Sequence, residues 1–167
     1  DIKPANIMVE KTDDGDILVK ILDFGISQLN DKGSKQEKQD RVVGSAPYMS
    51  PEQIRGEPLD ARSDIYSLGC SIFETLCGEP PFVADDYDDT VAMHLEDDTP
   101  LLRDRTDVDM PIEIDAVVQK CMHKEADRRY QNASELIIDL KRIIEDKPLQ
   151  HALNEQSFLE EQSESQT

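Results

Sequence analysis

The chain has 167 residues, enough for one domain with a hydrophobic core of its own. It carries 37 Asp and Glu residues against 18 Lys and Arg, and a net charge of -19 argues against a nucleic acid or an anionic membrane as the main partner. Cys70, Cys77 and Cys121 are odd in number and form no C-x-x-C pair, so we expect small core residues of a reducing, cytoplasmic compartment rather than a disulfide framework or a zinc site.

The first 45 residues predict a small β-hairpin and then a surface loop. Residues 6–10 and 17–22 are short apolar runs rich in β-branched side chains, and Asp14-Gly15 between them is a turn signal. Residues 26–45 are polar, with interleaved charges and no apolar period. We therefore expect a mobile loop there.

The clearest helical period begins after Arg62. Apolar residues recur at steps of three and four and form one wide face: Ile65, Leu68, Gly69, Ile72, Phe73 and Leu76. Ser63 and Asp64 suit the start of this helix, and Gly78 suits its end.

Three more helices are predicted downstream. They cover residues 87–95, residues 112–123 and a stretch that opens at Asn132, where Glu135 completes a capping-box pattern. No run is long and apolar enough to span a membrane. The predicted fold class is α+β and helix-dominated, with one small hairpin and about four helices.

Two polar features have simple interpretations. The acidic run at residues 85–89 lacks the spacing and the glycine of a Ca²⁺ loop, so a solvated face is expected. His94, His123 and His151 show no ligand spacing with the cysteines, which favours surface or packing roles.

Three short motifs carry the functional signal. The chain opens with Asp1-Ile2-Lys3-Pro4-Ala5-Asn6, Asp23-Phe24-Gly25 follows the second predicted strand, and Ser50-Pro51-Glu52 comes later. In this order and spacing they resemble the catalytic loop, the metal-binding loop and a later motif of protein kinases. The wording of residues 60–70, 78–82 and 127–136 is most similar to bacterial eukaryotic-like serine/threonine kinases.

The resemblance implies a role for four residues in transfer of the ATP γ-phosphate to Ser or Thr hydroxyls of proteins. Asp1 would orient the substrate hydroxyl, and Lys3 would place a cation against the phosphate. Asn6 and Asp23 would hold Mg²⁺, or Mn²⁺ in its place. Taken singly, these residues also suit a terminal residue, a turn residue and a strand-end cap, so the prediction depends on the joint match.

The resemblance also implies supporting roles downstream. Ser45 would stand beside the catalytic residues in the segment that receives the substrate, although Ala46 replaces the family's usual proline after it. Glu52 would form a buried ion pair with Arg129, or failing that with Arg128. Asp64 would accept hydrogen bonds from the catalytic-loop backbone, and a first-turn Asp favoured by the helix dipole is the simpler alternative.

Two serines of the predicted loop are candidate phosphorylation sites. Ser34 lies among lysines and is favoured over Ser27, while an unmodified serine in a loop is an equal alternative. After residue 147 the chain is rich in Gln, Glu and Ser. We expect a partial kinase domain over residues 1–147 and a disordered polar tail over residues 148–167.

The kinase parts that would precede Asp1 are not in these 167 residues: a Gly-rich loop, a strand Lys and a helix Glu. We therefore expect the C-terminal lobe of a kinase without its N-terminal lobe, inactive when isolated. One alternative is a non-catalytic binding module that docks through the surface left by the missing lobe. Another is an unstable fragment with molten character.

Overall fold

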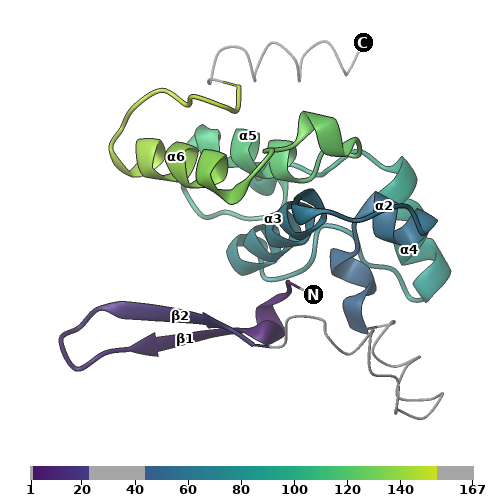
Figure 1. Cartoon of the computed structure of the whole chain (residues 1–167), viewed down its shortest axis with the longest axis horizontal. Coiled ribbons are helices and arrows are strands. Elements are labelled where there is room, and N and C mark those ends of the chain that lie inside the picture. The colour runs from purple at the N-terminus through teal and green to yellow at the C-terminus, as the bar shows by residue number, and fades with distance from the viewer. Residues whose placement is uncertain (1, 23–43, 154–167) are drawn as a thin grey trace.

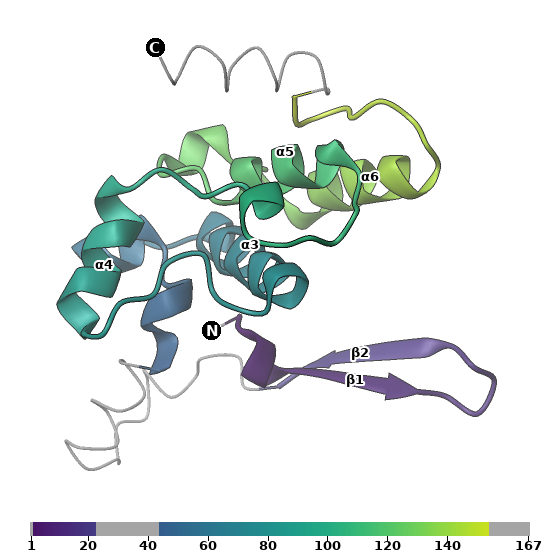
Figure 2. The ribbon, with the colours of Figure 1, turned by 180° about the vertical axis from the view of Figure 1, so that it is seen from behind.

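The computed structural model describes residues 2–22 and 44–153. In these residues a two-stranded hairpin extends away from a body of helices, as two opposite views show (Figures 1 and 2). The elements in chain order are η1 (Pro4–Asn6), β1 (Ile7–Lys11), β2 (Ile17–Ile21), η3 (Ala46–Tyr48), α2 (Pro51–Arg55), α3 (Ala61–Cys77), α4 (Tyr87–Glu96), η4 (Leu102–Asp104), α5 (Ile112–Cys121), η5 (Ala126–Arg128) and α6 (Ala133–Ile144). No helix in the described part of the chain is long and apolar enough to cross a membrane.

The hairpin is confirmed, with β1 and β2 antiparallel. Gly15 adopts a φ of 88° in the turn, a conformation that glycine takes without steric cost. Residues paired across an antiparallel ladder share a face. One face of the hairpin is therefore almost entirely apolar, because the pairs Ile7–Ile21 and Val9–Val19 and the side chain of Ile17 all lie on it.

Helix α3 is the centre of the helical body, but it starts earlier than the sequence predicted. Its N-cap is Asp60, whose carboxylate accepts a 2.8 Å hydrogen bond from the backbone N–H of Arg62. Ser63 and Asp64 therefore lie inside the first turn instead of at the cap. The end is as predicted, because Gly78 takes a left-handed conformation with φ of 84°.

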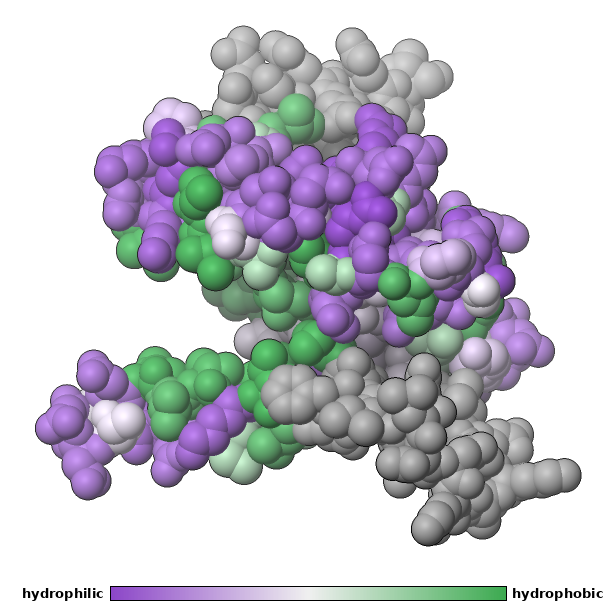
Figure 3. All heavy atoms as spheres, viewed as in Figure 1, coloured by the Kyte–Doolittle hydropathy of each residue, from purple (hydrophilic) through white to green (hydrophobic). Residues whose placement is uncertain are grey.

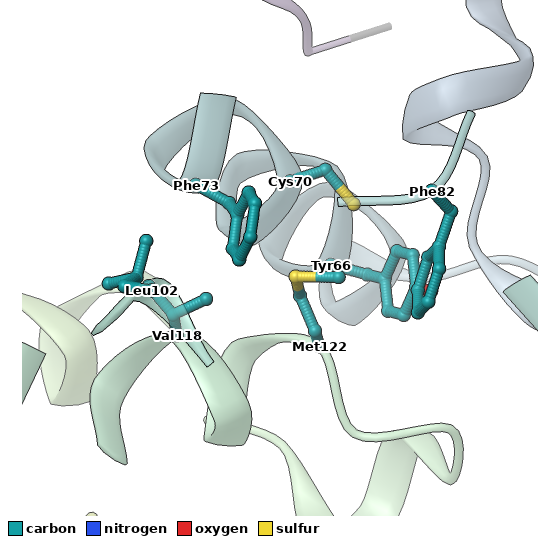
Figure 4. Close-up of a cluster of buried hydrophobic side chains, with 7 residues drawn as sticks. All are labelled: Tyr66, Cys70, Phe73, Phe82, Leu102, Val118 and Met122. Carbon is teal, nitrogen blue, oxygen red and sulfur yellow. The ribbon is translucent and has the colours of Figure 1, made fainter. Parts of the chain in front are cut away.

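The core lies where α3 packs against α5. One buried cluster joins α3 to the segments around it (Figure 4): Tyr66, Cys70, Phe73, Phe82, Leu102, Val118 and Met122. A second cluster joins α3 and α5 to α6: Ile65, Val117, Cys121, Tyr130 and Leu136. The two helices approach closely at Gly69, where a Cβ would lie 2.7 Å from the Cβ of Cys121.

The remaining predicted helices are present with small differences at their ends. Asn132 caps α6 by accepting from the Glu135 backbone N–H at 3.1 Å. The return bond of the predicted capping box differs, because the Glu135 carboxylate accepts from the backbone N–H of Gln131, one residue earlier than the cap. All three cysteines are free thiols, and Cys70 and Cys121 are buried.

The packed part of the chain extends past residue 147, where the predicted domain ended. Leu149 and Ala152 pack against the second cluster. The buried carboxylate of Asp139 accepts hydrogen bonds from the backbone N–H groups of residues 150–152, which fastens this segment to α6. Residues 154–167, the rest of the predicted tail, lie outside the described residues.

Candidate active site

The structure covers six of the predicted site residues. They are Lys3, Asn6, Ser45, Glu52, Asp64 and Arg129. The others, Asp1, Asp23, Ser27 and Ser34, lie outside the described residues.

A tight turn presents the first two of these side chains. Pro4–Asn6 forms one 3-10 turn, closed by a 2.9 Å hydrogen bond from the Asn6 N–H to the Lys3 carbonyl. The Asn6 carbonyl in turn accepts a 2.7 Å bond from the N–H of Leu22, which extends the hairpin ladder by one step. Asn6 therefore lies beside the end of β2, from which the chain continues into Asp23.

Lys3 contacts Ser45, which lies in the segment predicted to bind the substrate. Its Nζ donates a 2.9 Å hydrogen bond to Ser45 Oγ, across 42 positions of sequence. Ser45 is the residue before η3, so residues 45–48, here called the 45–48 segment, are placed beside the turn of Lys3 and Asn6. The structure thus brings together two predicted site residues from separate motifs.

Helix α3 holds the 45–48 segment from the other side. Ser67 Oγ donates a 2.7 Å bond to the Tyr48 carbonyl, and Tyr48 Oη donates a 2.6 Å bond to Glu74 Oε2. Burial and the neighbouring Glu74 carboxylate both raise the pKa of Tyr48, so its hydroxyl stays protonated.

Ser67 and Glu74, which hold Tyr48, were not among the predicted site residues, although the sequence contains a signal for the serine. Hydroxyl residues recur at every fourth position of α3: Ser63, Ser67, Ser71 and Thr75. The last three each donate to the carbonyl four residues earlier. The three serines are buried and Thr75 is exposed, so the row is a polar stripe that is mostly buried, on a helix whose apolar face alone was considered.

A short helix that the sequence analysis did not predict carries Glu52. Helix α2 starts at Ser50 with a full capping box, in which Ser50 Oγ accepts from the Gln53 N–H and Gln53 Oε1 accepts from the Ser50 N–H. Ser50 followed three residues later by Gln53 is the sequence signature of such a start. The cap fixes Glu52 in the first turn, pointing into the protein.

Glu52 forms a two-pronged ion pair with Arg129, and Arg128 is exposed. The two N···O distances are 2.7 Å and 2.8 Å. Arg129 also donates to the carbonyls of Arg62, His123 and Lys124. Its buried guanidinium therefore joins α2, the start of α3 and the loop before η5.

The electrostatics of this pair favour the charged state. Burial alone would raise the pKa of Glu52, but hydrogen bonds from Arg129 and Ser63 outweigh it and lower the pKa to about 2. The Ser63 hydroxyl supplies a 2.7 Å bond to Glu52 Oε1.

Asp64 lies in the first turn of α3 with an exposed side chain. That position suits the helix dipole. Its predicted contact with the catalytic-loop backbone stays a prediction.

The donor chemistry of this site fits Mg²⁺. The amide oxygen of Asn6 and the carboxylate of Asp23 are hard oxygen ligands of the kind that Mg²⁺ prefers, and Leu22, the residue before Asp23, is bonded to Asn6. Within residues 2–22 and 44–153, no three His, Cys, Asp or Glu side chains gather to hold a metal on their own.

Comparison with known proteins gives one consistent result. The chain matches the protein kinase domain family over residues 1–160. It is 47% identical over 146 residues to the serine/threonine-protein kinase PknB of Mycolicibacterium smegmatis, covering 87% of this chain and 23% of that protein. It is 42% identical over 149 residues to PknB of Mycobacterium tuberculosis, covering 89% and 23%. The probable serine/threonine-protein kinase PknB of Corynebacterium glutamicum is 43% identical over 148 residues, covering 86% and 22%.

The chain therefore spans less than a quarter of the length of the curated relatives it matches. Over the matched residues, the chain is 40–47% identical to the PknB proteins of the mycobacteria.

Proposed function

The chain belongs to the serine/threonine protein kinase family, and from this premise we propose that it forms the part of a kinase active site that receives the acceptor hydroxyl. The observation that carries the proposal is the hydrogen bond between Lys3 Nζ and Ser45 Oγ. It fixes a cation from the catalytic-loop motif against the segment that would hold the substrate. The reaction is transfer of the ATP γ-phosphate to Ser or Thr residues of a protein.

Each residue has a task that its chemistry suits. The ammonium group of Lys3, held by the Ser45 hydroxyl, would neutralise charge on the transferred phosphate without having to reorganise. The carboxylate of Asp1 would orient the acceptor hydroxyl and take its proton. ATP would supply the phosphoryl group. Asn6 and Asp23 would hold Mg²⁺, which would neutralise the negative charge of the phosphates.

The hairpin supports a second part of the proposal. Its apolar face is exposed in the described residues, with Val9 at 63% and Val19 at 56% exposure, and apolar side chains gather there (Figure 3). We propose that the nucleotide-binding lobe of a kinase domain covers this face. Phosphate transfer would then need the Gly-rich loop and the strand Lys of that lobe, so the 167 residues alone are expected to be inactive.

The same exposed face favours a second candidate function, a non-catalytic docking module. The two candidates differ in what Lys3 does, because a docking module does not need a cation held at the 45–48 segment. We place either function in the cytoplasm, on the grounds that the three thiols are free.

Phosphate transfer to a Ser/Thr peptide, measured in the full-length protein that carries this chain, tests the proposal. We expect Lys3→Ala to lower kcat by about 100-fold or more, the usual loss when one preorganised charge is removed. Ser45→Thr should keep the hydroxyl and most of the rate, whereas Ser45→Ala should lower it.

Lys20→Ala is the matched control, because Lys20 is an exposed lysine of the hairpin paired with Glu10. It should behave as the wild type does. A Lys3→Ala protein as active as the wild type would overturn the proposed role, and a wild type without any transfer would favour the docking module.

A further inference from the structure

His94 is a buried side chain with one polar ring atom that has no partner in the described part of the chain, which packing alone does not explain. It lies in α4 with none of its surface exposed. Its Nδ1 is 2.8 Å from Tyr66 Oη. Its Nε2 is a buried polar atom without a hydrogen-bond partner within the described ranges. Buried polar groups left without partners are rare and call for an explanation.

The contact between Tyr66 Oη and His94 Nδ1 fits either tautomer of the ring, and we assign the one in which Tyr66 donates. Burial raises the pKa of Tyr66 well above its usual value, so its hydroxyl keeps a proton that it can donate to Nδ1. Burial and the nearby Lys124 ammonium lower the pKa of His94 to about 3, so the ring is neutral. A neutral ring that accepts at Nδ1 carries its hydrogen on Nε2. The unpartnered atom is therefore an N–H donor.

An acceptor for this donor lies on the 45–48 segment. Helix α4 packs directly against η3, which contains Pro47. Against burial and Lys124, which lower the pKa of His94, the Pro47 backbone acts to raise it, although no hydrogen bond to Nε2 is formed among the described residues. Proline has no backbone N–H, so the group concerned is its carbonyl.

We propose that His94 is a positioning residue of the acceptor site, and that its Nε2–H donates a hydrogen bond to the carbonyl of Pro47. This inference rests on the proposed function. The bond would fix the 45–48 segment on the side of α4, as Ser67 fixes it on the side of α3 and Lys3 fixes Ser45.

Tyr66 extends this arrangement to the Glu52–Arg129 pair. The guanidinium carbon of Arg129 lies 4.9 Å from the centre of the Tyr66 ring. Tyr66 thus touches Arg129 with its ring and His94 with its hydroxyl. With the proposed bond from His94 to Pro47, a line of contacts would run from the ion pair to the 45–48 segment.

A histidine with only a packing role makes the opposite prediction for one substitution. His94 packs against the rings of Phe82 and Tyr66, with centroids 5.0 Å and 5.7 Å away. His94→Phe would keep this apolar contact and remove an unpartnered N–H. If packing were the whole role, that variant would be as stable and as active as the wild type.

The experiment is steady-state kinetics of the full-length protein with a Ser/Thr peptide and ATP. For His94→Phe we expect the KM for the peptide to rise about tenfold, with the KM for ATP changed less than twofold. His94→Gln keeps an amide donor at the end of the side chain and should recover most of the loss. Tyr66→Phe removes the hydroxyl that contacts Nδ1, so the His94 tautomer is no longer fixed, and the KM for the peptide should rise by an intermediate amount. His151→Phe is the control, since that ring lies beside α6, and should leave both constants unchanged.

An unchanged peptide KM in His94→Phe would overturn the inference. If His94→Phe does not fold, Tyr66→Phe takes its place, and an unchanged peptide KM in that variant overturns the inference equally. If the wild type transfers no phosphate, the proposed function fails, and NMR then tests the inference about His94 separately.

The inference requires a protonated Nε2 in the wild type. It also requires that the chemical shift of the Pro47 carbonyl carbon changes in His94→Gln or Tyr66→Phe, and an unchanged shift overturns it.

Discussion

The helical body and the β1–β2 hairpin use the same kind of apolar residues with opposite results. In α5, Val117 and Val118 are each 1% exposed, because α3 and α6 pack against that helix. In the hairpin, Val9 and Val19 pair with each other and remain 63% and 56% exposed. The two regions differ in the partners that their side chains meet.

This comparison separates local structure from stability. The hairpin forms with its predicted turn, but a two-stranded hairpin gains little stability by itself. The helical body gains its stability from contacts between residues far apart in the chain, such as Glu52 with Arg129. Changes at buried contacts of the body should therefore cost far more than equivalent changes on the hairpin.

The largest expected effect is that of Glu52→Ala. It leaves the buried guanidinium of Arg129 without its carboxylate, which should lower the free energy of unfolding by about 3–5 kcal/mol. Urea denaturation measures this loss. The matched control is Glu10→Ala, since Glu10 pairs with Lys20 at the same 2.7 Å but both side chains are about half exposed. That exposed pair should contribute about 0–1 kcal/mol. Equal losses in the two variants would contradict the contrast between body and hairpin.

Acid should weaken the body through the same carboxylate. The pKa of Glu52 in the folded protein is about 2, below its usual value of 4.5. The stability from this ionised group is therefore fully present above about pH 4.5 and is lost as the pH falls from there toward 2. Thermal unfolding between pH 6 and pH 2.5 should show this loss, and Glu52→Gln should show a shallower dependence on pH. Parallel curves for the two proteins would argue against the low pKa.

The sequence predicted what short-range patterns determine. The period of α3 and the turn at Gly15 are local properties, and the structure contains both. Helix α2 has only five residues and no apolar period, so it was missed although Ser50 and Gln53 signal its cap. The true start of α3 was missed because its first apolar face residue, Ile65, comes more than a turn after the Asp60 cap.

The candidate site was predictable only in part. The kinase resemblance assigned Lys3 and Ser45 to one site, and the structure joins them by a hydrogen bond. The resemblance also favoured Arg129 over Arg128 as the partner of Glu52, and that pair is present. The hydroxyl row of α3 marks Ser67 as a residue of interest, but its contact and that of Glu74 with Tyr48 could not be predicted, because they depend on how α3 packs against η3. That packing is a tertiary property with no local signature.

A smaller effect is expected at Gly69, where α3 and α5 approach closely. In Gly69→Ala the new Cβ would lie 2.7 Å from Cys121 Cβ and 2.8 Å from Met122 Cγ, so α3 and α5 would have to separate. Overpacking of this kind costs about 1–3 kcal/mol. Gly44→Ala is the control, because among the described residues no atom beyond its chain neighbours lies within 4 Å of its new Cβ. If Gly69→Ala unfolds at the same urea concentration as the wild type, the close approach of the two helices is wrong.

The smallest effect should come from the hairpin, and its size depends on what surrounds it. Val19→Thr keeps the β-branched shape at an exposed position, so in the 167-residue chain it should change stability by less than about 0.5 kcal/mol. Val117→Thr makes the same change in the core and buries a hydroxyl, at a cost of about 1–3 kcal/mol. In the full-length protein, the proposed nucleotide-binding lobe would cover Val19, and the cost of Val19→Thr should rise toward that of Val117→Thr. If Val19→Thr still costs almost nothing in the full-length protein, no lobe packs on this face. The contrast between exposed hairpin valines and buried valines of α5 would then hold in the whole protein as well.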